Sequence, residues 1–186
     1  HFRSDETAPA RIPQIGTRTP ALANDGADVA SAWQTIMEIG DREGLDMAIT
    51  DAFPGAHVDV SNRNGRFFLQ FYQNGLLRPL DQTELSDGTL RYLLWITALM
   101  TPRPPSLMIL NEPETSLHPD LLPALGRLIA KRSEDAQIWV ISHAQTLVSA
   151  LSKRGANEIV LDKDMSETFA HGQELFNTPS WNWPTR

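Results

Sequence analysis

The first part of the chain shows two successive hydrophobic periods. Across residues 29–39 the apolar side chains recur at helical spacing, and Gly40 follows as a natural stop. Asp41 can cap a second helix that runs to about Asp51. The pattern therefore predicts two short helices in succession.

The period then changes to two residues. Residues 57–60 alternate apolar with polar side chains, and residues 67–72 are rich in aromatic side chains, which is typical of strands. The turn dipeptides Asn64-Gly65 and Asn74-Gly75 follow them along the chain. An antiparallel meander is expected in this region.

Uninterrupted apolar runs mark the second half of the chain. Residues 107–110 and 138–141 are wholly apolar, as expected of buried parallel strands. The other predicted elements are helices at residues 90–100, 119–132 and 146–152 and a strand at residues 158–161. This alternation predicts an α/β fold, with a mostly parallel sheet flanked by helices and preceded by a small helical and antiparallel region.

Composition and pattern divide the chain into four parts. Residues 1–27 are rich in Pro, Thr, Ala and Gly and predict a loop or a poorly ordered lead-in. Residues 28–80 form the helical and β-meander region, residues 81–175 the α/β core, and residues 176–186 the tail. The tryptophan-rich tail is expected to pack on its own domain, with packing on a partner as the alternative.

Composition narrows the class of protein. The chain has 186 residues, of which 41% are hydrophobic and 21% charged, which is the profile of a soluble globular protein with a real core. It contains no cysteine, which excludes disulfides, thiolate catalysis and cysteine zinc sites and fits a cytoplasmic protein. The net charge of −7 argues against a large nonspecific grip on DNA or acidic lipid, although it leaves room for a small basic patch.

Targeting signals are not evident in the sequence. No apolar run approaches the length needed to span a membrane, and the polar first residues do not resemble a signal peptide. The chain does not begin with Met, so we expect a fragment or a trimmed protein.

Polar residues follow both apolar strands, where ligands bind in folds of this class. Asn111 and Glu112 follow the first strand, and Ser142 and His143 follow the second. A carboxylate held at the end of a buried strand can orient or deprotonate an attacking water in a nucleotide hydrolase. The alternative is an acidic side chain that merely faces solvent.

Ser86 to Thr89 stand at the start of the helix predicted to follow them. Free amides at a helix N-terminus favour an anion, so this segment could bind phosphate. Ser86 could equally be only a helix cap, with Asp87 interacting with the helix dipole. The two interpretations are compatible.

Three motifs together resemble those of ATP-binding-cassette (ABC) ATPases. Residues 107–119, LMILNEPETSLHP, resemble the Walker B segment and the D-loop that follows it. Residues 85–89, LSDGT, resemble the signature motif, and Ser142-His143 resembles the switch histidine. The match is close over residues 80–147, and within the superfamily it resembles soluble predicted ATPases of the AAA_21 type, in the branch of RecF, OLD and SMC proteins.

The resemblance implies a role for each matching residue. Glu112 would be the general base or water-positioning residue, and His143 would contact the γ-phosphate or the water. The residues implied to contact ATP or the dimer partner are Ser86, Asp87, Gly88, Thr89, Ser116 and His118, and Asn111 is the implied Mg²⁺ ligand. The fold implied is the C-terminal portion of a P-loop NTPase, with ATP and Mg²⁺ as cofactors.

The sequence departs from the family pattern in three ways. Asn111 stands where an Asp commonly holds Mg²⁺, and Asp87 places a negative charge near the incoming phosphate. No glycine is followed by lysine, so the Gly-Lys-Ser/Thr phosphate-binding loop (Walker A) is missing from the chain. An N-terminal lobe that carries that loop is therefore an expected partner.

The function expected of the intact protein is Mg-ATP hydrolysis by a head-to-tail dimer, either with a second copy or with a related ATPase half. The fragment by itself is expected to be inactive. One alternative is a non-hydrolytic ABC-like interaction domain, which Asn111 and the missing loop favour. Another is a DNA-associated ATPase, which the branch resemblance suggests and the acidic charge disfavours.

Overall fold

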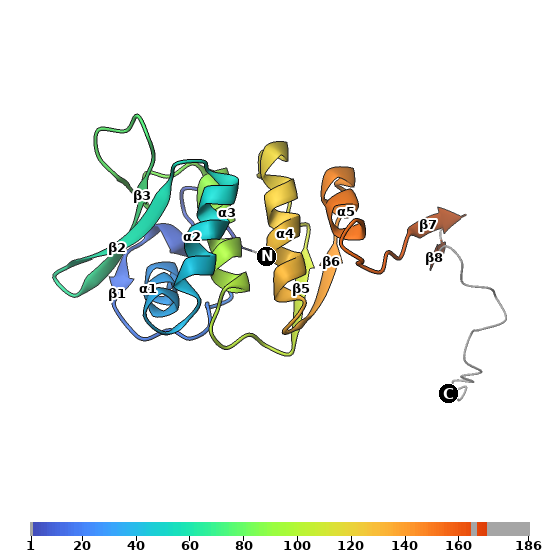
Figure 1. Ribbon diagram of the computed structural model, residues 1–186, viewed down its shortest axis with the longest axis horizontal. Helices are drawn as coiled ribbons and strands as arrows, with labels where there is room; N and C mark the ends of the chain where they lie inside the picture. The colour runs from blue at the N-terminus through green and yellow to red at the C-terminus, as the bar shows by residue number, and fades with distance from the viewer. Residues whose placement is uncertain (1, 165–166, 171–186) are drawn as a thin grey trace.

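The computed structural model describes residues 2–164 and 167–170. Figure 1 shows an antiparallel sheet at one end of the molecule, a group of helices beside it, and then a second, smaller sheet. The predicted helices α1 (Val29–Ile39) and α2 (Arg42–Ala52) are confirmed. Asp41 caps α2 by accepting a hydrogen bond from the Gly44 amide at 2.8 Å.

The predicted meander is also confirmed. Strands β2 (His57–Arg63) and β3 (Arg66–Tyr72) pair antiparallel along their whole lengths. Asn64 and Gly65 form the turn between them with positive φ angles of 54° and 78°, a conformation that suits these two residue types. The short strands β1 (Gln14–Ile15) and β4 (Leu80–Asp81) also pair with β3.

The lead-in has mostly irregular backbone, as expected of a loop, but it is packed against the rest of the protein. It contains a 3-10 helix, η1 (Pro9–Arg11), and the buried residues Phe2 and Ala10. The Phe2 ring meets the Trp95 ring edge-on, with centroids 4.9 Å apart. No local period could have predicted these contacts, because their partners lie far along the chain.

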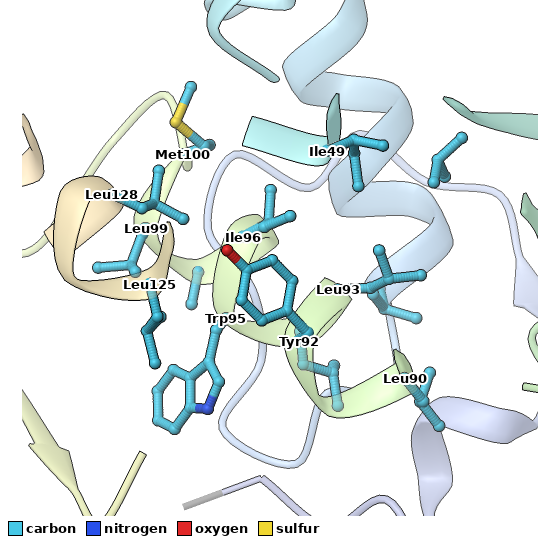
Figure 2. Close-up of a cluster of buried hydrophobic side chains, with 14 of the residues drawn as sticks. Ile49, Leu90, Tyr92, Leu93, Trp95, Ile96, Leu99, Met100, Leu125 and Leu128 are labelled. Carbon is cyan, nitrogen blue, oxygen red and sulfur yellow. The ribbon is translucent and has the colours of Figure 1, made fainter. Parts of the chain in front are cut away.

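Helix α3 (Asp87–Leu99) forms the centre of the hydrophobic core. Every residue from Leu90 to Leu99 is buried, as expected of a mostly apolar helix at the centre of a core, and the buried residues include Arg91 and Thr97. Figure 2 shows its side chains lying between Leu125 and Leu128 of α4 on one side and Ile49 of α2 on the other. The helix therefore connects the N-terminal region to the α/β region.

The β–α–β pattern predicted for the second half is confirmed. Strands β5 (Leu107–Asn111) and β6 (Gln137–Ile141) are parallel neighbours. The chain between them forms η2 (Pro119–Leu121) and α4 (Leu122–Arg132), and α5 (Gln145–Ser152) follows β6. The two strands are a two-stranded sheet in the described part of the chain.

The expectation that both strands are buried is wrong for one face of this sheet. Side chains of the covered face, such as Met108 and Val140, pack against the core. The opposite face is exposed by 39% at Leu107, 55% at Ile109, 54% at Trp139 and 53% at Ile141. We call these four residues the bare face; within residues 2–164 and 167–170 nothing buries it.

The strand predicted at residues 158–161 is displaced. Strand β7 (Leu161–Asp164) begins at the last of these residues and pairs antiparallel with β8 (Glu167–Ala170). Ile159 and Val160 precede it as exposed, irregular backbone. The tail, residues 176–186, lies outside the described residues. Among the helices of the described part, none is both long and apolar enough to cross a membrane.

Candidate functional site

The ends of β5 and β6 bring the two candidate catalytic residues together. Asn111 and Ile141 are register partners, and the Glu112 amide extends the ladder by donating to the Ile141 carbonyl at 2.8 Å. Glu112 and His143 therefore leave the sheet side by side. The nearest Glu112 carboxylate oxygen lies 3.8 Å from Nδ1 of His143, and both side chains are open to solvent.

The turn after β5 holds its backbone in an unusual conformation. Glu112 and Ser116 have positive φ angles of 45° and 64°, a backbone conformation that residues other than glycine rarely adopt. The Thr115 amide donates to the Glu112 carbonyl at 3.1 Å and closes the turn. Such conformations persist only where surrounding contacts impose them, and they concentrate at functional sites. We call residues 112–117 the strand-end turn.

Glu114 lies beside the candidate catalytic residues, and its contacts could not be read from the sequence pattern. Only 9% of its side chain is exposed. One carboxylate oxygen accepts hydrogen bonds from the Ser142 hydroxyl at 2.7 Å and from the His143 and Ala144 amides at 3.1 and 3.3 Å. Glu114 thus joins the strand-end turn to residues 142–144, which we call the switch segment.

The environment of Glu114 favours its charged form. Burial raises the pKa of the carboxyl. Hydrogen bonds from its own amide and from Ser142, His143 and Ala144 lower the pKa by a larger amount, so the pKa lies below its usual value. The other carboxylate oxygen is buried and has no hydrogen-bond partner among the described residues.

A second group of candidate residues surrounds the N-terminus of α3. The Ser86 hydroxyl accepts a hydrogen bond from the Thr89 amide at 3.1 Å and lies 2.9 Å from the Thr89 hydroxyl, so the capping role of Ser86 is confirmed. A Cβ atom at Gly88 would lie 2.8 Å from the Ser116 carbonyl oxygen. This position therefore requires glycine for α3 to approach the strand-end turn so closely.

An open hollow of about 670 Å³ lies beside this contact. It is lined by Ser86, Gly88, Thr89, Ser116 and His118 together with apolar side chains that include Phe53 and Leu117. Nδ1 of His118 accepts a hydrogen bond from the Asp120 amide at 3.3 Å, so this histidine is the N-cap of η2. The fold has gathered five candidate residues from two segments around one surface.

Asp87 is turned toward the lead-in. Its carboxylate forms an ion pair with Arg11 at 2.7 Å. Arg11, whose side chain is only 10% exposed, also donates to the carbonyls of Ser4 and Leu85 at 2.8 Å each. The negative charge that the sequence placed near a phosphate therefore has a cationic partner, which sequence reasoning missed because it lies 76 positions away.

Asn111 is exposed at the end of β5, on the side of the sheet that carries the bare face. The described residues contain no group of three or more His, Cys, Asp or Glu side chains suited to a metal ion. A single amide oxygen at a strand end nevertheless fits Mg²⁺, because this ion usually takes most of its ligands from water and phosphate.

Comparison with protein families matches residues 2–149 to AAA_21, described as "AAA domain, putative AbiEii toxin, Type IV TA system". No curated protein matches the sequence. The similar solved structures include three of SMC proteins.

The first comes from a study of "ATP-driven dimerization and DNA stimulated activation of SMC ATPases", with a TM-score of 0.59 and 13% identity over 74% of this chain and 86% of that one. The second is the Smc head of Pyrococcus yayanosii with a coiled coil and joint, with a TM-score of 0.59 and 14% identity over 74% of this chain and 27% of that one.

The third is an SMC head bound to the C-terminal winged-helix domain of ScpA, with a TM-score of 0.60 and 12% identity over 81% of this chain and 54% of that one. The present chain thus spans only part of the longer of these structures. At such identities the likeness shows the fold alone, which is that of a P-loop NTPase.

Proposed function

The chain belongs to the AAA_21 family of AAA domains, and on that premise we propose that it supplies the hydrolytic side chains of a Mg-ATPase. The observation that carries the proposal is the placement of Glu112 and His143 beside each other at the ends of two parallel strands. In open α/β sheets, ligands bind at this edge. The hollow at the N-terminus of α3 gives a second surface suited to phosphate.

Each residue then has a distinct task in hydrolysis. The Glu112 carboxylate accepts a proton from the water, whose oxygen attacks the γ-phosphorus, while the bond from the γ-phosphorus to the β,γ-bridging oxygen breaks and ADP leaves with that oxygen. His143 donates a hydrogen bond to the γ-phosphate or holds the water. Mg²⁺, when bound, neutralises charge on the phosphates, and Asn111 is the residue that would hold it.

The N-terminus of α3 would contribute to the site of a partner. In a head-to-tail dimer, the γ-phosphate of the ATP bound to the other half would face Ser86, Gly88 and Thr89. The dimer contact would include Ser116 and His118.

The exposure of the bare face supports the proposal that a partner lobe carries the phosphate-binding loop. Parallel sheets are normally covered on both faces, and this sheet exposes Ile109 and Trp139 by more than half. The sequence itself has no Gly-Lys pair from which to build such a loop. We therefore expect no micromolar binding of Mg-ATP to the 186-residue chain alone, as measured by calorimetric titration.

The decisive experiment replaces Glu112 by Gln in the assembled protein, with the lobe present. ATP binding is expected to be retained while kcat falls at least about a hundredfold, because the amide cannot accept the proton. Glu134→Gln, an exposed substitution in the turn after α4, is the matched control and is expected to leave kcat unchanged. Normal turnover in the Glu112→Gln variant would remove Glu112 from the mechanism.

A non-hydrolytic interaction domain is the second candidate function. The neutral Asn111 and the missing loop favour it, since both weaken the case for metal-assisted hydrolysis. It predicts an assembled protein that binds its partner but shows no turnover sensitive to Glu112. A DNA-associated role would require DNA affinity that falls steeply with salt, and the net charge of −7 weighs against it.

A further inference from the structure

Glu114 binds the switch segment through a single carboxylate oxygen atom. That atom accepts all three hydrogen bonds that link it to Ser142, His143 and Ala144. The acceptor lies at the start of α5, where a negative charge is favourable and amides have no acceptor within the helix. The Ala144 amide also donates to the Ser142 hydroxyl oxygen at 3.1 Å. The contact therefore fixes both the path of the switch segment and the beginning of the next helix.

The candidate catalytic residues do not fix each other. The 3.8 Å between the Glu112 carboxylate and Nδ1 of His143 is too long for a hydrogen bond, and 47% and 79% of their side chains are exposed. The two segments that carry them are joined by the backbone bond from Glu112 to Ile141 and by the Glu114 contacts. Of these, only Glu114 reaches the backbone of His143 itself.

The strand-end turn is also anchored from the core side. The indole nitrogen of Trp95, which is buried in α3, donates to the Pro113 carbonyl at 3.0 Å. Pro113 directly precedes Glu114, so the residue that holds the switch segment is tied to the central helix. A displacement of α3 would thus be transmitted through Glu114 to His143.

We propose that Glu114 is a positioning residue for hydrolysis, which sets the place of His143 relative to Glu112. This inference rests on the proposed function, in which these two residues act on the water and the γ-phosphate. The Ser142 hydroxyl and the two amides all donate to one oxygen, so a glutamine at position 114 can keep the three bonds through its amide oxygen. Alanine removes all of them.

The first measurement uses the 186-residue chain and needs no nucleotide. Hydrogen exchange followed by NMR is expected to show slow exchange of the His143 and Ala144 amides in the wild type and in Glu114→Gln. In Glu114→Ala the His143 amide is expected to exchange at least about tenfold faster, because it loses its acceptor. The Ala144 amide keeps the Ser142 hydroxyl oxygen as a second acceptor at 3.1 Å and is expected to change less. Equal protection of the His143 amide in Glu114→Ala would overturn the proposal.

The second measurement uses the assembled ATPase. Glu114→Ala is expected to lower kcat about ten- to a hundredfold with KM for ATP within about twofold, and Glu114→Gln is expected to restore most of kcat. A merely structural role would not produce this rescue, so equal losses in both variants would overturn the proposal. If Glu114→Ala does not fold, Ser142→Ala removes one of the three bonds and is expected to give a smaller loss of kcat, whereas normal kcat would count against the proposal.

Failure of the proposed function gives a different pattern. If Glu112→Gln and His143→Ala also leave turnover unchanged, the site does not hydrolyse ATP. The claim that Glu114 positions His143 is then decided by the exchange measurement alone.

Discussion

Single residues at this site are defined by distant hydrogen-bond partners more than by their own chemistry. Glu114 is acidic and follows a proline in a polar segment, yet it is largely buried because three donors surround one of its oxygens. Asp87 is likewise a partner of Arg11 as well as the first residue of a helix. At the scale of single residues, the protonation of Glu114 is therefore expected to affect the stability of the chain.

The stability of the chain should carry a pH dependence due to Glu114. Its pKa in the folded chain is below the ordinary value of 4.5, so its contribution is complete above that pH and is lost as pH falls through the folded-state pKa. In urea denaturation, the free energy of unfolding of the wild type relative to Glu114→Gln is expected to be greater at about pH 7 than at about pH 3.

The same comparison is needed in a His143→Ala background, because the His143 imidazole lies 3.7 Å from the Glu114 carboxylate. Asp5, Asp41 and Glu84 also have lowered pKa values, and they are unchanged in both members of each pair and therefore cancel. A difference that stays constant with pH would contradict the prediction.

Elements of the fold are locked together by a few buried polar side chains. Arg11 lies in η1 and donates to carbonyls on both sides, those of Ser4 and of Leu85, as well as to the Asp87 carboxylate. It thereby fixes the lead-in to the segment that begins α3. Arg11 belongs to no recognisable motif, yet it is expected to contribute to the stability of the fold by joining these elements.

Substitution of Arg11 should destabilise the chain far more than substitution of its ion-pair partner. Arg11→Ala leaves buried carbonyls without donors and is expected to lower the free energy of unfolding by about 2–4 kcal/mol. Asp87→Asn is expected to cost under about 1 kcal/mol, because the Asp87 side chain is 55% exposed and Arg11 keeps its carbonyl acceptors. Urea denaturation of both variants measures this, and similar losses would show that the ion pair dominates.

In the described part of the chain, the N-terminal region encloses its core, whereas the small parallel sheet is exposed on one face. The antiparallel sheet, the helices and the lead-in enclose α3, so the N-terminal region has a well-buried core. The small parallel sheet has helical packing on one face and the bare face on the other. At this scale the open surface is the feature that a partner lobe would have to cover.

A charge placed on the bare face should block assembly without unfolding the chain. Ile109→Lys changes a residue that is already 55% exposed, so the thermal midpoint of the 186-residue chain is expected to change by only a few degrees. Binding of the lobe is expected to weaken at least about tenfold, because a lysine would be buried without a partner. Leu77→Lys, at an exposed leucine beyond β3, is the control. Unchanged lobe binding, measured by calorimetry, would place the lobe elsewhere.

Local pattern by itself determined most of the elements and the order of the motifs. Helical spacing placed α1 and α2, two-residue alternation and the Asn64-Gly65 turn placed the meander, and apolar runs placed β5 and β6. The sequence also placed Glu112 and His143 at the carboxyl ends of parallel strands, and the structure shows that these strands are neighbours. These features depend on residues that are close in sequence, and for that reason the pattern was sufficient.

The tertiary structure alone decided what depends on contacts between distant segments. It buried Glu114 under the switch segment, paired Asp87 with Arg11, and packed Phe2 against Trp95. It also showed that no described residue covers one face of β5 and β6. An apolar run cannot reveal this, because the run indicates that burial is favourable but not which segment provides it. Burial and hydrogen bonding at these positions are set by the whole chain, and no local period carries that information.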